Sequence, residues 1–511
     1  MSAEPAPHSS GTSSRWSVLA ILLLVLFIGV RLPNLGSPLL GRHDFRQTQT
    51  MLTAYWFAQD GVSLPDYPLP VFGAPWTAPF EFPLFQFIAA AVHRTGVPLD
   101  LSGQIVALLF FFACVLLFLR LARKLELGPY TCSILLVFCG LSPFALVWSR
   151  ATLVDFSSVT FAVAFLGACL DAYERHWTLK RFVAAVILGV FAALTKITTL
   201  PVFLPAVFAL AVADSIKNWR ATNADTKHRY KAAFIWAAIL TVPLICGAVW
   251  TAATDVIKAQ SPFTANLTSS ALQSWNFGTF AQRLSPENWQ VLWQRISHWV
   301  IPWSWPFTLL GLASMASSTR AQQLVVGGLF FGGLLTPLVF FNLYVVHDYY
   351  LCAIVFPVWL VTARGVTTAI ASLSMKARAW AIIGAIVIYA YTSLNAPYAL
   401  SAYVDHSNHE IYQFAVAARE KIPVGTEVVV FGEDWNPRIP YYLQCKAMMV
   451  RPGMVSESDA VRYASRHHVR HVVAVGVARA QINALWPSAC TVLEYPSCTL
   501  YSLPNGKGES D

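Results

Sequence analysis

Ionisable side chains stand beside long apolar segments at several points of the chain, and the first of them follow the apolar residues 16–30. The stretch GRHDFRQTQTMLTAYWFAQDG, residues 41–61, opens with Asp44 and Arg46 and then carries large apolar residues at helical spacing. Charged groups at a membrane are costly, so by default they indicate function. A carboxylate near a cation and an apolar surface suits glycosyl transfer from a lipid phosphate. The carboxylate takes the proton of the acceptor hydroxyl, and the cation stabilises the departing phosphate.

Four groups of ionisable residues are candidates for this chemistry. They are Asp44 with Arg46, Glu81 alone, Arg150 with Asp155, and Lys196 with the run HDYY at residues 347–350. We predict Asp44 to be the general base. We predict that the other candidates hold the donor phosphate or contact the substrate: Arg46, Glu81, Arg150, Asp155, Lys196, His347, Asp348 and Tyr349.

Each candidate also has a purely structural interpretation. An acidic residue at a helix start can cap the helix or be favoured by its dipole, which applies to Asp44, Glu81 and Asp155. The other structural roles are an ion pair of Arg46 with Asp44, a Lys196 side chain extended to the membrane surface, and a solvated pair of His347 with Asp348.

The composition indicates a polytopic membrane protein. Of the 511 residues, 56% are hydrophobic and only 12% are charged, whereas a soluble domain carries about 25% charged residues. The net charge of +9 does not indicate nucleic-acid binding, because the basic residues cluster in short loops between apolar segments. We therefore expect the lipid bilayer to be a partner of this chain and nucleic acid not to be one.

Hydropathy predicts about eleven spans within residues 16–396, after a disordered cytoplasmic N-terminus at residues 1–15. The expected spans are Trp16–Arg31, Leu101–Leu119, Pro129–Trp148, Phe156–Tyr173, Phe182–Leu194, Thr198–Ala213, Ala232–Ala253, Val300–Met315, Gln322–Phe341, Leu351–Val361 and Ala379–Tyr391. Arg and Lys follow the even-numbered spans, and the positive-inside rule makes that face cytoplasmic. The long loops 32–100 and 254–299, all candidate site residues and the chain after Asn395 are then expected outside. The apolar segment Phe80–Val92 is short for a span and is expected to lie in the membrane interface.

Residues 397–511 have the alternating pattern of a small α/β domain. The pattern predicts helices at His409–Lys421 and Ser456–His467, strands at Glu427–Phe431 and Val469–Val475, a short helix or strand at Ile439–Met449, and a closing hairpin at Cys490–Leu503. Cys490 and Cys498 flank the turn of that hairpin, and the sequence is equally compatible with a disulfide and with two free thiols.

The chain resembles the membrane-embedded GT-C glycosyltransferases, in particular the bacterial relatives of protein O-mannosyltransferases and of the aminoarabinose transferase that modifies lipid A. The resemblance covers residues 31–396 and is carried by HDFRQTQT after the first span, FEFPLFQFIAAAV, Asp155 at the head of the fourth span, TKITTLP and HDYY. The segment FGEDWNPRIPYY looks like part of the external α/β domain of some members. The resemblance implies that Asp44 is the base. Many members carry two adjacent acidic residues there, whereas His43 precedes and Phe45 follows Asp44.

These observations predict an all-α polytopic membrane domain of GT-C type followed by a small extracytoplasmic α/β domain. The expected function is transfer of a sugar from a polyprenyl-phosphate donor to an extracytoplasmic acceptor, which could be a lipid, a glycan or a protein, at the inner membrane. Participation of a divalent cation is left open. The main alternative is a transporter or flippase, which would place charged groups near the midplane and show inverted repeats. A glycan polymerase or ligase, or a non-enzymatic assembly subunit, are further alternatives.

Overall fold

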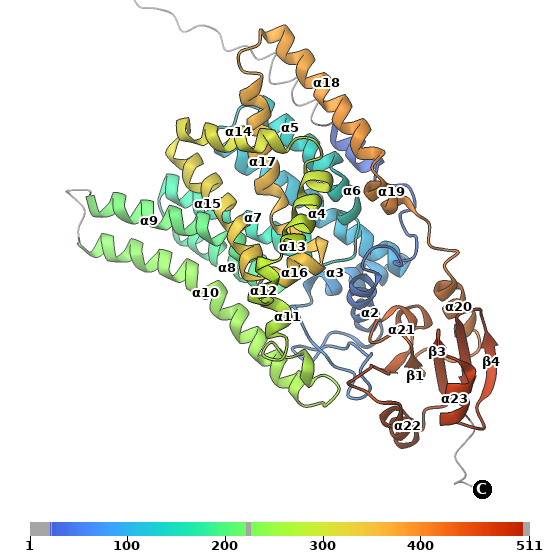
Figure 1. Cartoon of the computed structure of the whole chain (residues 1–511). Coiled ribbons are helices and arrows are strands. Elements are labelled where there is room, and N and C mark those ends of the chain that lie inside the picture. The colour runs from blue at the N-terminus through green and yellow to red at the C-terminus, as the bar shows by residue number, and fades with distance from the viewer. Residues whose placement is uncertain (1–20, 22, 221–225, 504–511) are drawn as a thin grey trace, which may run out of the picture.

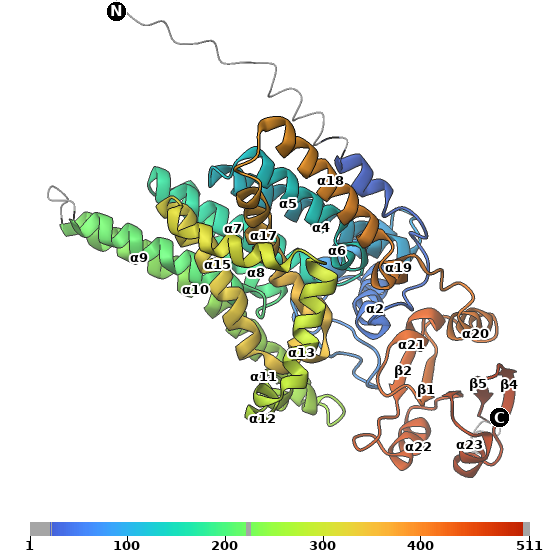
Figure 2. The ribbon, with the colours of Figure 1, turned by 45° about the horizontal axis from the view of Figure 1, so that its top comes forward.

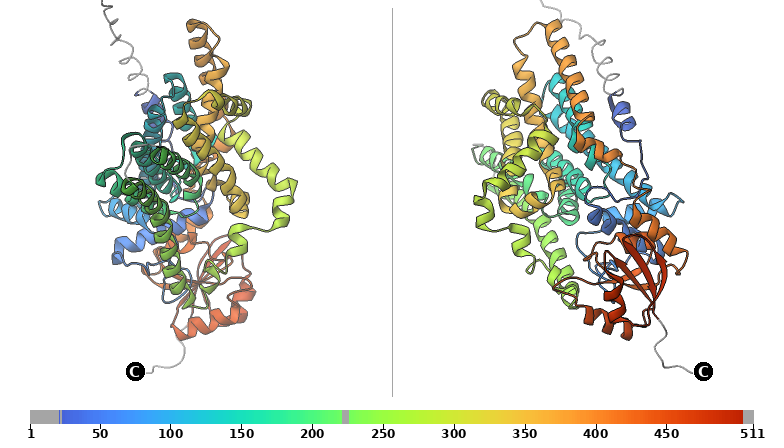
Figure 3. Two further views of the ribbon diagram at one scale, coloured as in Figure 1. Left: turned by 90° about the vertical axis from the view of Figure 1, so that its left-hand side faces the viewer. Right: turned by 45° about the vertical axis from the view of Figure 1, so that its right-hand side comes forward.

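The computed structural model describes residues 21, 23–220 and 226–503, and of the side chains at 227 and 228 nothing is described. The expected anchor Trp16–Arg31 lies partly outside these residues, but residues 23–29 are helical. The N-terminal segment 1–15 lies wholly outside them. A bundle of helices and a small sheet domain are joined end to end (Figure 3).

Helices make up the membrane part of the chain (Figure 1). They are α2 (Asp44–Asp60), α3 (Leu84–His93), α4 (Leu99–Lys124), α5 (Pro129–Leu141), α6 (Pro143–Trp148), α7 (Asp155–Arg175), α8 (Leu179–Thr195), α9 (Leu204–Arg220), α10 (Thr226–Ala259), α11 (Gln273–Phe277), α12 (Phe280–Leu284), α13 (Pro286–Gln294), α14 (Trp305–Ala313), α15 (Arg320–Val339), α16 (Phe341–Val346), α17 (Val355–Ala369), α18 (Met375–Leu394) and α19 (Pro397–Leu400).

Within the described residues, five helices are long and apolar enough to cross a membrane by themselves: α4, α7, α10 from Arg229, α15 and α18. Several other expected spans are shorter or divided. Pro143 cannot continue the backbone bonding of α5, so the span expected at Pro129–Trp148 becomes α5 and α6. The span expected at Leu351–Val361 instead begins at Val355 and continues to Ala369. The segment expected at the interface, Phe80–Val92, contains the short helix α3.

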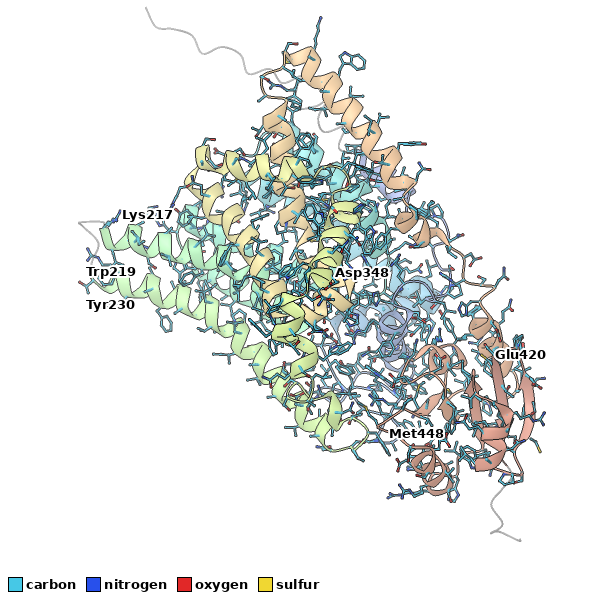
Figure 4. All side chains as sticks on the ribbon, viewed as in Figure 1. Lys217, Trp219, Tyr230, Asp348, Glu420 and Met448 are labelled. Atoms are coloured by element: carbon cyan, nitrogen blue, oxygen red, sulfur yellow. The ribbon has the colours of Figure 1, made fainter. Side chains whose placement is uncertain are left out.

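The core of the bundle lies around α7, which packs against α4 and α8. α9 and α10 extend away from this core as a pair, and Trp219 and Tyr230 lie near their far ends (Figure 4). α10 has many exposed apolar side chains, Phe234, Ile245, Val249 and Val256 among them. Such a surface suits contact with lipid.

The C-terminal sheet domain, residues 410–502, has five strands in the order β2-β1-β3-β5-β4. Its elements are α20 (Glu410–Arg419), β1 (Glu427–Phe431), α21 (Arg438–Leu443), β2 (Lys446–Met449), α22 (Glu457–Arg466), β3 (His471–Val475), α23 (Arg479–Leu485), β4 (Cys490–Glu494) and β5 (Cys498–Ser502). β1, β2 and β3 are parallel, and the predicted hairpin β4–β5 is antiparallel. In this hairpin Cys490 lies opposite Ser502 and not opposite Cys498. The thiols of Cys490 and Cys498 are both free, so the two residues form no disulfide.

The first long loop of the bundle docks on the edge of this sheet (Figure 2). The backbone of residues 70–73 forms hydrogen bonds with β2: Gly73 N to Ala447 O at 3.0 Å, Ala447 N to Pro70 O at 2.9 Å and Met449 N to Val71 O at 3.3 Å. These bonds satisfy backbone groups that an edge strand would otherwise expose. The sheet domain and the loop that carries Asp44 are therefore one structural unit.

Candidate active site

Asp44 is the first residue of α2, and its carboxylate faces the sheet domain. Its Oδ1 accepts a hydrogen bond from the backbone N–H of Phe45 at 2.8 Å. Its Oδ2 lies 3.2 Å from Nη1 of Arg438 and 3.4 Å from Nδ2 of Asn436. His43 occupies the N-cap position, in a left-handed conformation with φ of 49°. The interpretation of Asp44 as the N-cap is therefore wrong by one residue, although a carboxylate in the first turn still suits the helix dipole.

Arg46 pairs with Glu81 rather than with Asp44. Its Nη2 lies 3.0 Å from Oε1 of Glu81, and its Nη1 donates to Oε1 of Gln49 at 2.7 Å. Burial disfavours the charged form of Glu81, but Arg46, Lys196, Lys258 and a backbone hydrogen bond together outweigh it and keep the pKa of this carboxyl below its usual range. The ion pair expected between Arg46 and Asp44 does not form, because side chains two positions apart on a helix do not face each other.

Lys196 and Asp155 form a second ion pair, and this one is buried. Nζ of Lys196 lies 2.6 Å from Oδ1 of Asp155, and their side chains are only 4% and 6% exposed. Lys196 follows the last residue of α8, where the chain leaves the helix in an extended conformation. Its ammonium also lies 3.8 Å from the ring centre of Tyr350 and 4.9 Å from that of Tyr349. Lys196 therefore does not extend to the membrane surface.

The two ion pairs lie in one place. Arg46, Glu81 and Asp155 line the same cavity, which has a volume of about 20 Å³, enough for one water molecule. The other polar side chains of its wall are Gln49, Thr50, Thr53, Tyr67 and Gln86. α2, the loop before α3 with the first turn of α3, and the start of α7 supply this wall. The cavity therefore joins three segments that are far apart in the sequence.

Asp348 is buried in the helical bundle, not solvated (Figure 4). Its Oδ1 lies 2.9 Å from Nε2 of His43, and its Oδ2 accepts from the hydroxyl of Tyr398 at 2.9 Å. Trp148 in turn donates to that hydroxyl at 2.7 Å. Burial disfavours the charged form of Asp348, but the interactions with His43, the hydrogen bond from Tyr398 and the charge of Arg295 together outweigh it and keep the pKa of this carboxyl below its usual range.

His347 and Tyr349 flank Asp348 in the sequence. The ring of Tyr349 contacts the ammonium of Lys196. The rings of His43 and Tyr349 are 4.9 Å apart, edge to face. Burial and the nearby charge of Arg46 lower the pKa of His347 to about 3, so this imidazole is neutral at ordinary pH. The HDYY segment thus links His43, next to Asp44, with Lys196.

Arg150 does not join this group. Its Nη1 donates to the backbone oxygen of Pro33 at 2.8 Å. It lines a separate cavity of about 60 Å³ together with Arg42, Gln47 and His406. Of the nine predicted site residues, the structure brings Arg46, Glu81, Asp155, Lys196 and the HDYY residues together, places Asp44 against the sheet domain, and leaves Arg150 apart.

The sequence-based prediction did not include the residues that hold Asp44. These lie in the loop after β1, in the segment FGEDWNPR, and are Glu433, Trp435, Asn436 and Arg438. Directly after a buried strand, this segment has a Gly, two acidic residues, a Trp and an Arg. That pattern could have indicated a functional loop. The distance in sequence, 394 residues between Asp44 and Arg438, gave no reason to connect it with α2.

Within residues 21–503 as described, no group of three His, Cys, Asp or Glu side chains converges as metal ligands. The two carboxylates that line the cavity, Glu81 and Asp155, each have a basic partner. This donor set does not fit a preformed divalent-cation site, which needs several oxygen ligands free for the ion.

Comparison with solved structures identifies the fold. ArnT from Cupriavidus metallidurans bound to undecaprenyl phosphate is similar over 97% of this chain and 98% of that chain, with a TM-score of 0.63 and 12% identity. The apo form of the same protein gives a TM-score of 0.62 at 12% identity, over 96% of this chain and 98% of that one. The oligosaccharyltransferase of Archaeoglobus fulgidus, in complex with Zn and sulfate, gives 0.54 at 13% identity, over 89% of this chain and 68% of that one.

No family model matches the sequence, and no curated protein is similar to it in sequence. The structural likeness nevertheless confirms the predicted fold class: the chain has the GT-C fold, with a helical membrane domain followed by a small sheet domain. The apolar helices and these neighbours make it an integral membrane protein.

Proposed function

We propose that this protein is a glycosyltransferase that moves a sugar from a polyprenyl-phosphate donor to an acceptor outside the cytoplasm. The observation that carries the proposal is the meeting of two cations, Arg46 and Lys196, with Glu81 and Asp155 at the head of the apolar helices. These cations suit a phosphate whose apolar tail stays in the bilayer, and the cavity beside them, which has room for about one water molecule, must widen to admit it. The ArnT structure with bound undecaprenyl phosphate supports a donor of this type.

In the proposed reaction the acceptor hydroxyl attacks the anomeric carbon of the sugar while the bond from that carbon to the phosphate oxygen breaks. The proton of the hydroxyl goes to the carboxylate of Asp44, and the electron pair of the broken bond leaves with the polyprenyl phosphate. Arg46 and Lys196 stabilise the negative charge of the leaving phosphate. A single displacement of this kind inverts the configuration at the sugar carbon.

The proposed orientation is based on the distribution of cations. Arg123 and Lys124 end α4, Arg175 ends α7, and Arg320 begins α15. The opposite end of α7 begins with Asp155 of the candidate site. By the positive-inside rule the cationic end faces the cytoplasm, so the candidate site and the sheet domain face outward.

The test is release of polyprenyl phosphate from a pool of radiolabelled polyprenyl-phosphate sugars by the purified protein, with an extract of envelope lipids, glycans and proteins added as the acceptor. We expect Asp44→Asn to lower turnover by about 10²–10⁴-fold, the range for loss of a general base. Asp60→Asn, at the exposed far end of the same helix, is the matched control and should turn over like the wild type.

Equal turnover by Asp44→Asn and wild type would contradict the role of Asp44, and the base would then be sought at Asp155 or Glu81. If the wild type turned over no donor in the pool, the glycosyltransferase proposal would be wrong. The transporter or flippase hypothesis would then be tested by transport of the same lipids in vesicles.

A further inference from the structure

A side chain of the sheet domain contacts Asp44, the proposed base, directly. The loop after β1 places Arg438, the first residue of α21, with Nη1 3.2 Å from Oδ2 of Asp44. The two side chains are 24% and 22% exposed, so the contact is partly shielded from solvent. Asn436 of the same loop donates to the same oxygen at 3.4 Å. Every partner of Oδ2 among the described residues comes from the sheet domain.

Glu433 fixes the orientation of the guanidinium. Nε of Arg438 lies 2.5 Å from Oε2 of Glu433, and Nη2 lies 2.7 Å from Oε1. The side chain of Glu433 is only 2% exposed. Two parallel bonds of this kind define both the position and the plane of an arginine side chain. The remaining nitrogen, Nη1, is then directed at Asp44.

The loop is itself held against the first loop of the bundle. The ring of Trp435 lies 4.4 Å from that of Phe45, 5.2 Å from that of Phe72 and 6.1 Å from that of Phe80. Phe45 is the residue after Asp44, so the aromatic contact and the ion pair act on neighbouring positions of α2. The hydrogen bonds between residues 70–73 and β2 add a third connection.

We infer that Arg438 is a positioning residue for Asp44, and that the sheet domain therefore contributes a residue to the active site. The inference rests on the proposed function of Asp44 as the base. A carboxylate held through Oδ1 by Phe45 N–H and through Oδ2 by Arg438 has one orientation, and small displacements of a reacting group can cost about 10²-fold in rate. Lysine cannot replace this arginine, because one ammonium cannot make two parallel bonds to Glu433 and also reach Asp44.

Two substitutions of Arg438 test the inference through kcat and KM. Arg438→Gln should lower kcat by about 10–100-fold while the KM for the polyprenyl-phosphate sugar changes less than about twofold, because the donor phosphate is held elsewhere. Arg438→Lys should recover only part of the loss. Arg462→Gln, an exposed arginine of α22, is the matched control and should behave like the wild type.

A double-mutant cycle separates positioning from general destabilisation. In an Asp44→Asn background, Arg438→Gln should change kcat by less than about twofold, because the group that Arg438 orients is already lost. A reduction by the same factor in both backgrounds would show that Arg438 acts only on the fold. An unchanged kcat for Arg438→Gln alone would also overturn the inference.

A measurement without substrate distinguishes this inference from the proposed function. Carbodiimide labelling of carboxyl groups, followed by mass spectrometry of the full-length protein, reports whether Asp44 is protected. We expect slow labelling in the wild type and in Arg462→Gln and faster labelling in Arg438→Gln. Equal labelling in all three would overturn the contact itself. Protection of Asp44 in a protein that turns over no donor would instead contradict the proposed function alone.

Discussion

Nζ of Lys196 lies 2.6 Å from Oδ1 of Asp155, and both side chains are almost completely buried at the point where α7 begins and α8 ends. Removing one partner of a buried ion pair leaves an uncompensated charge in a medium that cannot solvate it. Replacing both partners removes that penalty. The energetic role of the pair can therefore be tested independently of any substrate.

We expect Lys196→Met alone to destabilise the protein by about 3–5 kcal/mol, and Lys196→Met with Asp155→Leu to be considerably more stable than that single variant. The measurement is denaturant unfolding in detergent. Lys124 and Asp171 form a matched pair at the other end of α7, with side chains 20% and 28% exposed. Asp171→Asn should therefore cost less than about 1 kcal/mol. Equal costs at the two ends would contradict the importance of burial.

Glu81 makes the stability of the first loop dependent on pH. Burial opposes its ionisation, but Arg46 and the other nearby cations, with a backbone hydrogen bond, together outweigh burial and lower its pKa in the folded state. A carboxyl with a lowered folded pKa contributes stability above its unfolded pKa, about 4.3, and loses that contribution as the pH falls through the folded value. We expect the difference in Tm between wild type and Glu81→Gln to be constant from about pH 7 to 5 and to shrink below about pH 4. A difference that grows in acid would contradict this sign.

Trp435 should determine how firmly the sheet domain is docked. Its contacts with Phe45, Phe72 and Phe80 are offset or edge-to-face aromatic pairs, each worth about 0.5–1.5 kcal/mol beyond burial. We expect Trp435→Ala to speed proteolysis in the connection at residues 404–408 and to lower turnover. Trp486→Ala, which packs on Phe431 within the sheet domain, is the control. It should destabilise the domain without affecting turnover in the fraction that remains folded.

Gly432 is required at the start of the loop that carries Glu433 and Arg438. Its φ is +87°, and a Cβ atom built there would lie 1.8 Å from the backbone oxygen of Val475. Gly432→Ala should therefore displace the loop and lower kcat as Arg438→Gln does. Gly476→Ala, at φ +64° but with nothing within 4 Å of the added Cβ, carries only the conformational cost of about 1–2 kcal/mol. Similar kcat values for the two variants would contradict the steric argument.

Local patterns in the sequence predicted the elements well where one short segment decides the outcome. The strand Glu427–Phe431 has its predicted bounds, because a run of β-branched and aromatic residues ends at a Gly that has positive φ. Asp155 heads its helix as expected. The division at Pro143 was missed because hydropathy averages over a window and does not register one broken hydrogen bond.

Most of the residues named from the sequence lie together in the structure, but their pairing was not predicted. The partners of Asp44 and Arg46 follow from three-dimensional placement: Asp44 meets Arg438 of the sheet domain, and Arg46 meets Glu81 of the first long loop. Arg150 was grouped with Asp155 because only four residues separate them, yet an irregular turn between α6 and α7 directs it to Pro33. Such pairings depend on contacts between distant segments, which spacing in one sequence does not encode.

α10 has a mechanical consequence for the site. Its 34 residues form a helix about 50 Å long, whereas the hydrocarbon layer is about 30 Å thick. Just beyond its end, the backbone oxygen of Phe263 accepts a hydrogen bond from Arg451 of the sheet domain at 3.3 Å. Because the helix is this long, each degree of tilt about one end moves the other end by about 1 Å. Tilting is one way in which a helix longer than the hydrocarbon layer is accommodated, so we expect a change in lipid thickness to affect the contact between Phe263 and the sheet domain.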